Sequence, residues 1–263
     1  MNQAFKNARA TFKFFWRELM WERRRIVPAM IMSNVKVCCE DPPEQAAQHG
    51  RGAGHMWISE VGFDGRTISG TLLNEPAWLV SYKQGQPLSL PAIKISDWMY
   101  VYSDDKVHGA FTVQLLRSKM GKRERKQHDG AWGLEFGDPD QVRIIPDDWN
   151  PSVVEKKGLL GNLFGGSKPP AKVDYQSIEH PMDINMLESM EEFLAKSPEA
   201  LKSTDDIGWT LLHQQASAGS VSGVKCLLKH GADANAKSNI GLTPLQIAKG
   251  LGWRDVTKLL SKL

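Results

Sequence analysis

The last third of the chain repeats itself at an interval of 33 residues, and this period constrains the fold more than any other feature. Residues 208–212, Gly-Trp-Thr-Leu-Leu, align with residues 241–245, Gly-Leu-Thr-Pro-Leu. A stripe of valine and leucine follows each block, at 224–228 and at 256–260. A fixed period of this size with matched identities predicts a stack of similar helical units.

The residue types within the period suit paired helices. Thr210 and Thr243 can cap the first helix of each unit, and Pro244 suits its first turn. Gly231 can end the second helix in a left-handed conformation. This pattern resembles the ankyrin repeat, which implies a protein-binding face formed by turns and helices. The resemblance also implies that His213 hydrogen-bonds neighbouring loops rather than acting in catalysis.

The repeat region is short. Met190, Phe193 and Leu194 resemble the end of a degenerate first repeat, so residues 175–263 are expected to hold about two repeats and a cap. A Gly- and Pro-rich linker is expected at 151–174.

The first 150 residues alternate between helical and strand-like patterns, which predicts an α+β domain with an antiparallel sheet and flanking helices. Its core is expected within residues 1–120, with an extension to 150. Asp64-Gly65 predicts a two-residue hairpin turn, and 40–54 is expected to be a loop. The other expected elements are a helix over 5–19, strands at 27–39, 56–61, 67–73, 88–95, 98–102 and 110–116, and short pieces at 132–136 and 142–145 that finish or cover the sheet.

Three motifs of this domain resemble the YegJ-like bacterial domain of unknown function: Met56-Trp57-Ile58, residues 95–100 and residues 109–112. Such domains joined to ankyrin repeats resemble bacterial immunity proteins encoded beside secreted antibacterial toxins, including type VI secretion effectors. The resemblance therefore implies an immunity protein that neutralises a cognate toxin, such as a nuclease.

Charge and cysteine content restrict the partners and the compartment. The 33 basic and 30 acidic residues give a net charge of +3, too small to attract nucleic acid by bulk charge. Residues 117–126 are strongly basic; a solvated loop is the favoured interpretation and nucleic-acid binding the alternative. Cys38, Cys39 and Cys226 suit reduced thiols and a cytoplasmic location. The sequence has no apolar stretch of eighteen or more residues, so no membrane span is predicted.

No motif predicts a reaction, so the chain is expected not to be an enzyme and to need no cofactor. Glu60 and Asp97 could be drawn as an acid–base pair, but Asp97 is expected to cap or brace its strand. Trp57, Trp98 and Tyr100 are expected to pack in the core rather than form a ligand surface. The histidines and cysteines lack a metal-binding spacing, so no metal site is predicted.

The partner is expected to be a protein, the cognate toxin. The sequence does not indicate the oligomeric state. A general ankyrin adaptor that binds another cellular protein is the alternative. The candidate contacts are acidic residues, repeat tips and one aromatic anchor: Asp138, Asp140, Asp147, Asp148, Glu188, Glu191, Glu192, Asp205, Asp206, Trp209, Lys237, Ser238 and Asn239. Trp78 and Trp253 are further possible anchors.

Overall fold

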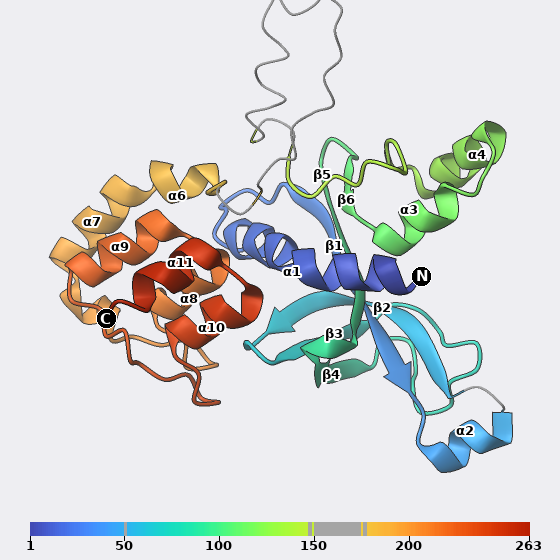
Figure 1. Ribbon diagram of the computed structural model, residues 1–263, viewed down its shortest axis with the longest axis horizontal. Helices are drawn as coiled ribbons and strands as arrows, with labels where there is room; N and C mark the ends of the chain where they lie inside the picture. Colours follow the sequence, from blue (N-terminus) through green and yellow to red (C-terminus); the bar gives the residue numbers. More distant parts are fainter. Residues whose placement is uncertain (50–51, 147–148, 150–174, 176–177) are drawn as a thin grey trace, which may run out of the picture. The chain divides into compact units, whose positions relative to one another are not determined.

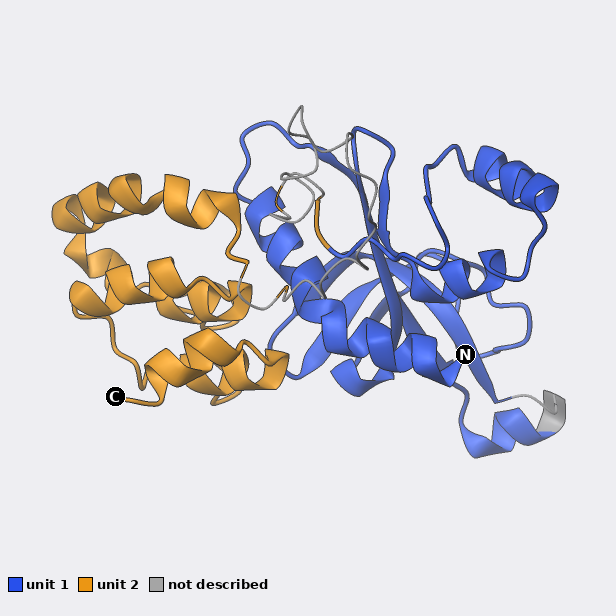
Figure 2. Ribbon diagram, turned by 45° about the horizontal axis from the view of Figure 1, so that its top comes forward, with its two compact units in different colours: residues 1–144 blue, residues 145–263 orange. Residues whose placement is uncertain are grey.

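The chain forms two compact units, residues 1–144 and residues 145–263 (Figure 2), and each is described by itself. The predicted linker at 151–174, Asp147 and Asp148 lie outside the residues that the structure describes. The structure, a computed structural model, describes residues 1–49, 52–146, 149, 175 and 178–263.

Unit 1 is built on a six-stranded sheet in the order β4-β3-β2-β1-β5-β6, with every neighbouring pair antiparallel (Figure 1). This confirms the predicted α+β class. Its elements are α1 Asn2–Glu22, β1 Met30–Glu40, α2 Pro43–His49, β2 Ala53–Phe63, β3 Thr67–Leu72, β4 Pro87–Pro91, the 3₁₀ turn η1 Ala92–Lys94, β5 Ile95–Tyr102, β6 Val107–Gly109, α3 Phe111–Arg117 and α4 Lys122–Trp132.

Helix α1 packs along one face of this sheet, as its apolar periodicity predicts (Figure 1). Phe12 and Phe15 are buried, and the Phe12 ring meets Phe63 of β2 edge to face at 5.5 Å. The indole nitrogen of Trp98 on β5 donates to the carbonyl oxygen of Ala8 at 2.9 Å. This bond satisfies the polar atom of a fully buried tryptophan, so Trp98 belongs to the core as expected.

The other face of the sheet has a second core. Met99 and Val101 of β5 are buried there together with Val113 of α3 and Phe136. Glu135 exchanges backbone hydrogen bonds with Asp105 and Val107 beside β6. The apolar piece at 132–136 therefore covers the sheet edge, which is one of its two expected roles.

The hairpin between β2 and β3 forms as predicted, but its turn is shifted by one residue. Gly65 has a φ of 102°, whereas Arg66 has no positive φ, and the amide of Asp64 donates to the Thr67 carbonyl oxygen at 3.3 Å. Gly65 and Arg66 are thus the central pair. The Asp64 carboxylate accepts from the amides of Arg66 and Thr67, which explains the shift.

The predicted strand at 110–116 is wrong, because these residues form most of α3. The buried Asp97 carboxylate accepts from the amides of Phe111 and Thr112 at 2.9 and 2.7 Å, and from the Thr112 hydroxyl at 2.5 Å. A carboxylate at a helix N-terminus satisfies orphan amides and complements the helix dipole. The deciding residue lies on β5, outside the segment, so local alternation could not reveal it.

Two predicted loops also contain helices, and one predicted strand is interrupted. Residues 40–54 include α2, which begins at Pro43, a residue suited to a first helical turn. In the basic segment 117–126, Arg117 ends α3, residues 118–121 form the expected turn, and Lys122–Lys126 form the first part of α4 instead of a loop. The strand expected at 88–95 ends at Pro91, which has no amide to donate, and η1 separates it from β5.

Unit 2 stacks helix pairs, with α8 packed on α10 and α9 on α11. Thr210 and Thr243 cap their helices as predicted. Each forms a reciprocal capping box with the residue three positions later, His213 or Gln246. His213 contacts the carbonyl oxygen of Leu242 at 3.0 Å, which confirms its link to the neighbouring loop. The elements are α6 Pro181–Asn185, α7 Leu187–Lys196, η5 Pro198–Leu201, α8 Leu211–Ala218, α9 Val221–Lys229, α10 Pro244–Leu251 and α11 Arg254–Leu260.

Among the described residues, no helix combines the length and the apolar character needed to cross a membrane.

Candidate functional site

The turns that precede α8 and α10 form two neighbouring tips with exposed side chains. Asp205 and Asp206 are exposed on the first tip, and Lys237 and Asn239 on the second. Asn239 joins the tips, because its amide donates to the Ile207 carbonyl oxygen at 3.0 Å and its side-chain nitrogen to the Asp206 carbonyl oxygen at 2.9 Å. Four predicted contact residues are therefore brought together on one ordered edge.

Ile207 and Ile240 are the apolar members of these tips, and sequence reasoning missed them. Their exposed fractions are 36% and 39%, and they occupy equal positions 33 residues apart. The 33-residue period was the signal that could have found them.

Trp209 and Ser238, two other candidate contacts, are buried at 1% and 6% exposure, which contradicts their assignment as surface contacts. The Trp209 ring stacks beside the His213 ring. Trp253 is also buried, and its indole donates to the Ser217 carbonyl oxygen at 2.9 Å. Of the three tryptophans proposed as anchors, Trp78 alone is exposed, at 41%.

The acidic residues Glu188, Glu191 and Glu192 are exposed on α7, away from the two tips in sequence. Glu191 accepts from the Lys229 ammonium on α9 at 3.0 Å. This hydrogen bond and the charge of Lys229 lower the pKa of Glu191. The carboxylate therefore stays ionised at neutral pH, beside a second helix.

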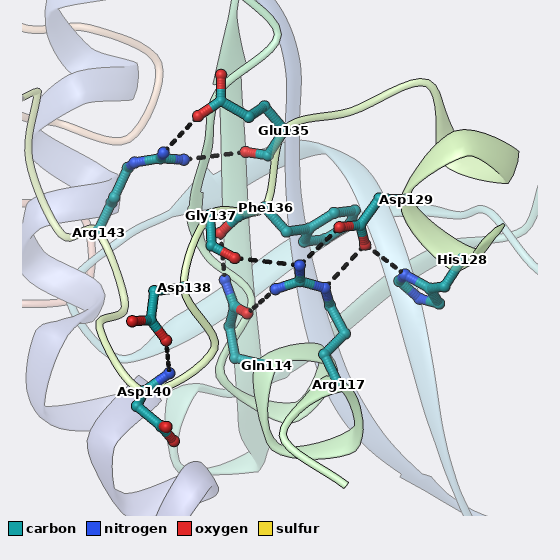
Figure 3. A network of polar contacts seen from close by, with 10 residues as sticks. All are labelled: Gln114, Arg117, His128, Asp129, Glu135, Phe136, Gly137, Asp138, Asp140 and Arg143. Atoms are coloured by element: carbon teal, nitrogen blue, oxygen red, sulfur yellow. Dashed lines mark hydrogen bonds and ion pairs between the residues drawn. The ribbon is translucent and has the colours of Figure 1, made fainter. Parts of the chain in front are cut away.

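Asp138 and Asp140 lie beside a polar network that joins α3, α4 and the segment after α4 (Figure 3). Arg117 is almost fully buried and donates to both carboxylate oxygens of Asp129 at 2.8 and 2.6 Å. Its guanidinium also lies 5.1 Å from the centre of the Phe136 ring. Partial burial opposes ionisation of Asp129, but bonds from Arg117 and His128 lower its pKa. The network thus anchors α4.

An open groove of about 810 Å³ runs between α4 and the turn before β6. Lys122, Arg125 and Lys126 of α4 line it together with the acidic Asp104 and Asp105. Phosphates entering the groove would therefore meet carboxylates, which weakens the case for nucleic-acid binding through 117–126.

Glu60 and Asp97, the two carboxylates considered as an acid–base pair, each make a structural hydrogen bond in unit 1. Asp97 is fully buried and caps α3, which confirms its expected bracing role, and burial raises its pKa. Glu60 is exposed and accepts from the Thr71 hydroxyl at 2.6 Å. Beside Asp97, the Lys36 ammonium donates to the Thr112 hydroxyl at 2.9 Å and lies over the Trp57 ring. Trp57 is thus half-buried by packing and a cation–π contact.

One group of side chains within the described residues could hold a metal ion: Glu191, Cys226 and His230. Its ligand atoms all lie within 4.8 Å of one another. Sequence reasoning did not find it, because Glu191 comes from another helix. The spacing of Cys226 and His230, four residues apart, was the available signal.

Comparisons with known proteins agree with both halves of this architecture. Residues 1–136 match the family described as "Uncharacterized protein conserved in bacteria (DUF2314)", and residues 182–262 match "Ankyrin repeats (3 copies)". An ankyrin repeat protein of Neisseria meningitidis serogroup B is 38% identical over 260 residues, which cover 99% of this chain and 92% of that protein.

Two other relatives match one part each. The uncharacterized protein YegJ of Escherichia coli is 32% identical over 76 residues, 29% of this chain and 48% of YegJ. Human protein phosphatase 1 regulatory subunit 27 is 32% identical over 96 residues, 34% of this chain and 62% of that protein. The family match covers just over half of the chain, so the chain belongs to the DUF2314 family of bacterial proteins and carries C-terminal ankyrin repeats.

Proposed function

We propose that this protein is a non-catalytic adaptor that binds a protein partner through the tips of its ankyrin repeats. The observation that carries the proposal is the pair of exposed isoleucines, Ile207 and Ile240, held at equal positions of successive repeats. Apolar side chains on ordered backbone lose little entropy when a partner covers them.

The tips combine this apolar centre with charged neighbours. Asp205 and Asp206 directly precede Ile207, and Lys237 lies three residues before Ile240. An apolar centre with a polar rim is the usual composition of a protein interface. A relative with similar repeats is named as a regulatory subunit of a phosphatase, a protein that by its name acts with another protein.

Photo-crosslinking tests the proposal. A photoreactive amino acid replaces the exposed Lys237 of the second tip in the full chain, which leaves the Asn239 bonds between the tips intact, and the bacterium expressing it supplies the partners. The double substitution Ile207→Ser and Ile240→Ser should weaken the recovered complex more than tenfold, since truncating two contacts removes at least about 1.4 kcal/mol of binding energy.

The matched control is Ile93→Ser, which changes an isoleucine that is 70% exposed in unit 1. This variant should bind normally. Equal binding by the double variant and the parent protein would contradict the proposal.

Toxin neutralisation is a narrower form of the same function, with the cognate toxin as the partner and the cytoplasm as the location. The relatives described above are named for repeats, for regulation or as uncharacterized, so the general adaptor is the better-supported form. Co-expression with a toxin encoded next to the gene tests the narrower form, which requires cell survival and a stoichiometric complex. Charge reversal at Asp205 and Asp206 should then slow association.

A further inference from the structure

We infer that Glu191, Cys226 and His230 form a binding site for a zinc-like divalent cation that joins α7 to α9. The inference goes beyond partner binding, because it concerns how the short repeat array is held together.

The helix geometry places two ligands on one face. Cys226 lies in the last turn of α9, and His230 is the residue at its C-terminal end. The His230 amide donates to the Cys226 carbonyl oxygen at 3.2 Å, so the helical spacing continues through both residues. Side chains four residues apart on a helix project in the same direction.

The third ligand comes from the neighbouring helix. Glu191 on α7 lies beside α9, where the Lys229 ammonium contacts its Oε1 atom at 3.0 Å. The carboxylate has two oxygens, so one can meet a cation while the other keeps this contact. Lys229 is 71% exposed and can also turn toward solvent.

Two side chains of the cluster carry atoms that could bind a ligand. The Nε2 atom of His230 is buried and has no hydrogen-bond partner among the described residues. Cys226 is a free thiol, 5% exposed, within the same cluster. A buried ring nitrogen without a partner is unfavourable, and a metal ion in the cluster would satisfy it.

The donor set selects the kind of metal. Thiolate sulfur, imidazole nitrogen and carboxylate oxygen are the ligands of zinc, whereas magnesium and calcium take oxygen ligands. Three protein ligands leave a fourth tetrahedral position for water. Binding releases the Cys226 thiol proton to solvent, so the bound sulfur is a thiolate.

The consequence is mechanical. Helix α7 belongs to the degenerate cap, and α9 to the first full repeat. A metal bridge between them would staple the cap to an array that has few repeats to bury its core.

Cobalt binding to the chelator-treated full chain tests the inference. One Co²⁺ per chain should give a thiolate-to-cobalt charge-transfer band in the near ultraviolet and tetrahedral bands in the visible, and Zn²⁺ should abolish them. Zn²⁺ should also raise the melting temperature.

Cys226→Ala should remove the charge-transfer band, and His230→Gln and Glu191→Gln should each weaken binding at least tenfold. Circular dichroism checks that each variant is folded, and His230→Gln keeps the test decisive if Cys226→Ala is not.

Cys38→Ala is the matched control. Cys38 also lies near a carboxylate that pairs with a lysine, because its thiol contacts Glu40, which accepts from Lys94 at 2.6 Å. The Cys38→Ala variant should bind cobalt like the parent chain. Absence of a band in the parent chain, or a band lost in Cys38→Ala but kept in Cys226→Ala, would overturn the inference.

Discussion

The two units differ in how far along the sequence their structural hydrogen bonds reach. In unit 1, Asp97 bonds residues 14 and 15 positions away, and Trp98 bonds Ala8 across 90 positions. In unit 2, the capping boxes of Thr210 and Thr243 join residues three positions apart, and the longer bonds of His213 and Trp253 reach only an adjacent repeat, 29 and 36 positions away. Unit 1 is therefore specified by contacts between distant segments, and unit 2 mainly by a local pattern that recurs.

A pair of glycines should show this difference with the largest effect. Gly109 of unit 1 and Gly231 of unit 2 both have positive φ, 75° and 89°. A Cβ on Gly109 would overlap the carbonyl oxygen and the ring of Trp98, whereas nothing lies within 4 Å of a Cβ on Gly231. Gly109→Ala should cost unit 1 about 4 kcal/mol, and Gly231→Ala should cost unit 2 about 1 kcal/mol.

Hydrogen exchange of the slowest amides in each unit measures both free energies. The variants are compared at matched pH and temperature, with the parent chain as reference. Equal losses would show that Trp98 yields to the added methyl group and that distant packing does not dominate unit 1.

Acid should destabilise unit 1 through His108. This ring is buried and stacks on Tyr100 at 4.5 Å. Burial lowers the pKa of His108 to about 4, with Arg143 acting in the same direction and Glu18 and Asp104 opposing it. The unfolded chain binds a proton near the ordinary pKa of about 6.5. Between these values the unfolded state holds more protons, so stability falls as pH falls, by about 3 kcal/mol in total.

Urea unfolding of unit 1 between pH 7 and pH 4 measures this loss. His108→Phe keeps a ring against Tyr100 and should flatten the pH dependence of unit 1 while leaving that of unit 2 unchanged. A variant with the slope of the parent chain would assign the loss to other groups.

The same difference explains what the sequence could reveal. The repeat region, its caps and the link from His213 to Leu242 were predictable, because the period and the residue types carry that information locally. The strand expected at 110–116 was wrong because Asp97, on another strand, makes α3 a helix. The loop expected at 117–126 was wrong for Lys122–Lys126, which begin α4, a helix that the buried Arg117 anchors through Asp129. For the same reason, the cluster of Glu191 with Cys226 and His230 needed the fold.

Each unit has an ion pair between a basic side chain and a carboxylate, and the two pairs differ in how deeply the basic side chain is buried. Arg117 is 3% exposed and pairs with Asp129, whereas Lys229 is 71% exposed and pairs with Glu191. Arg117→Met keeps an aliphatic chain beside Phe136 but removes both bonds from Arg117 to the Asp129 carboxylate, and it should cost unit 1 about 2 kcal/mol.

Lys229→Met should leave the stability of unit 2 unchanged, because water replaces its contact. Both variants are measured by urea unfolding in the presence of a chelator. A similar loss in both would contradict the role assigned to burial.

The smallest expected effects test whether unit 2 is as local as its pattern suggests. Thr243 caps α10 through Gln246, and Thr243→Ala should cost about 1 kcal/mol and expose only the first turn of α10 to exchange. Thr210 also contacts the ring of His213, which in turn contacts Leu242 in the next repeat. Thr210→Ala should therefore speed exchange in α8 and also at the start of α10. If exchange rises in α8 alone, the two repeats are joined by apolar packing and not through His213.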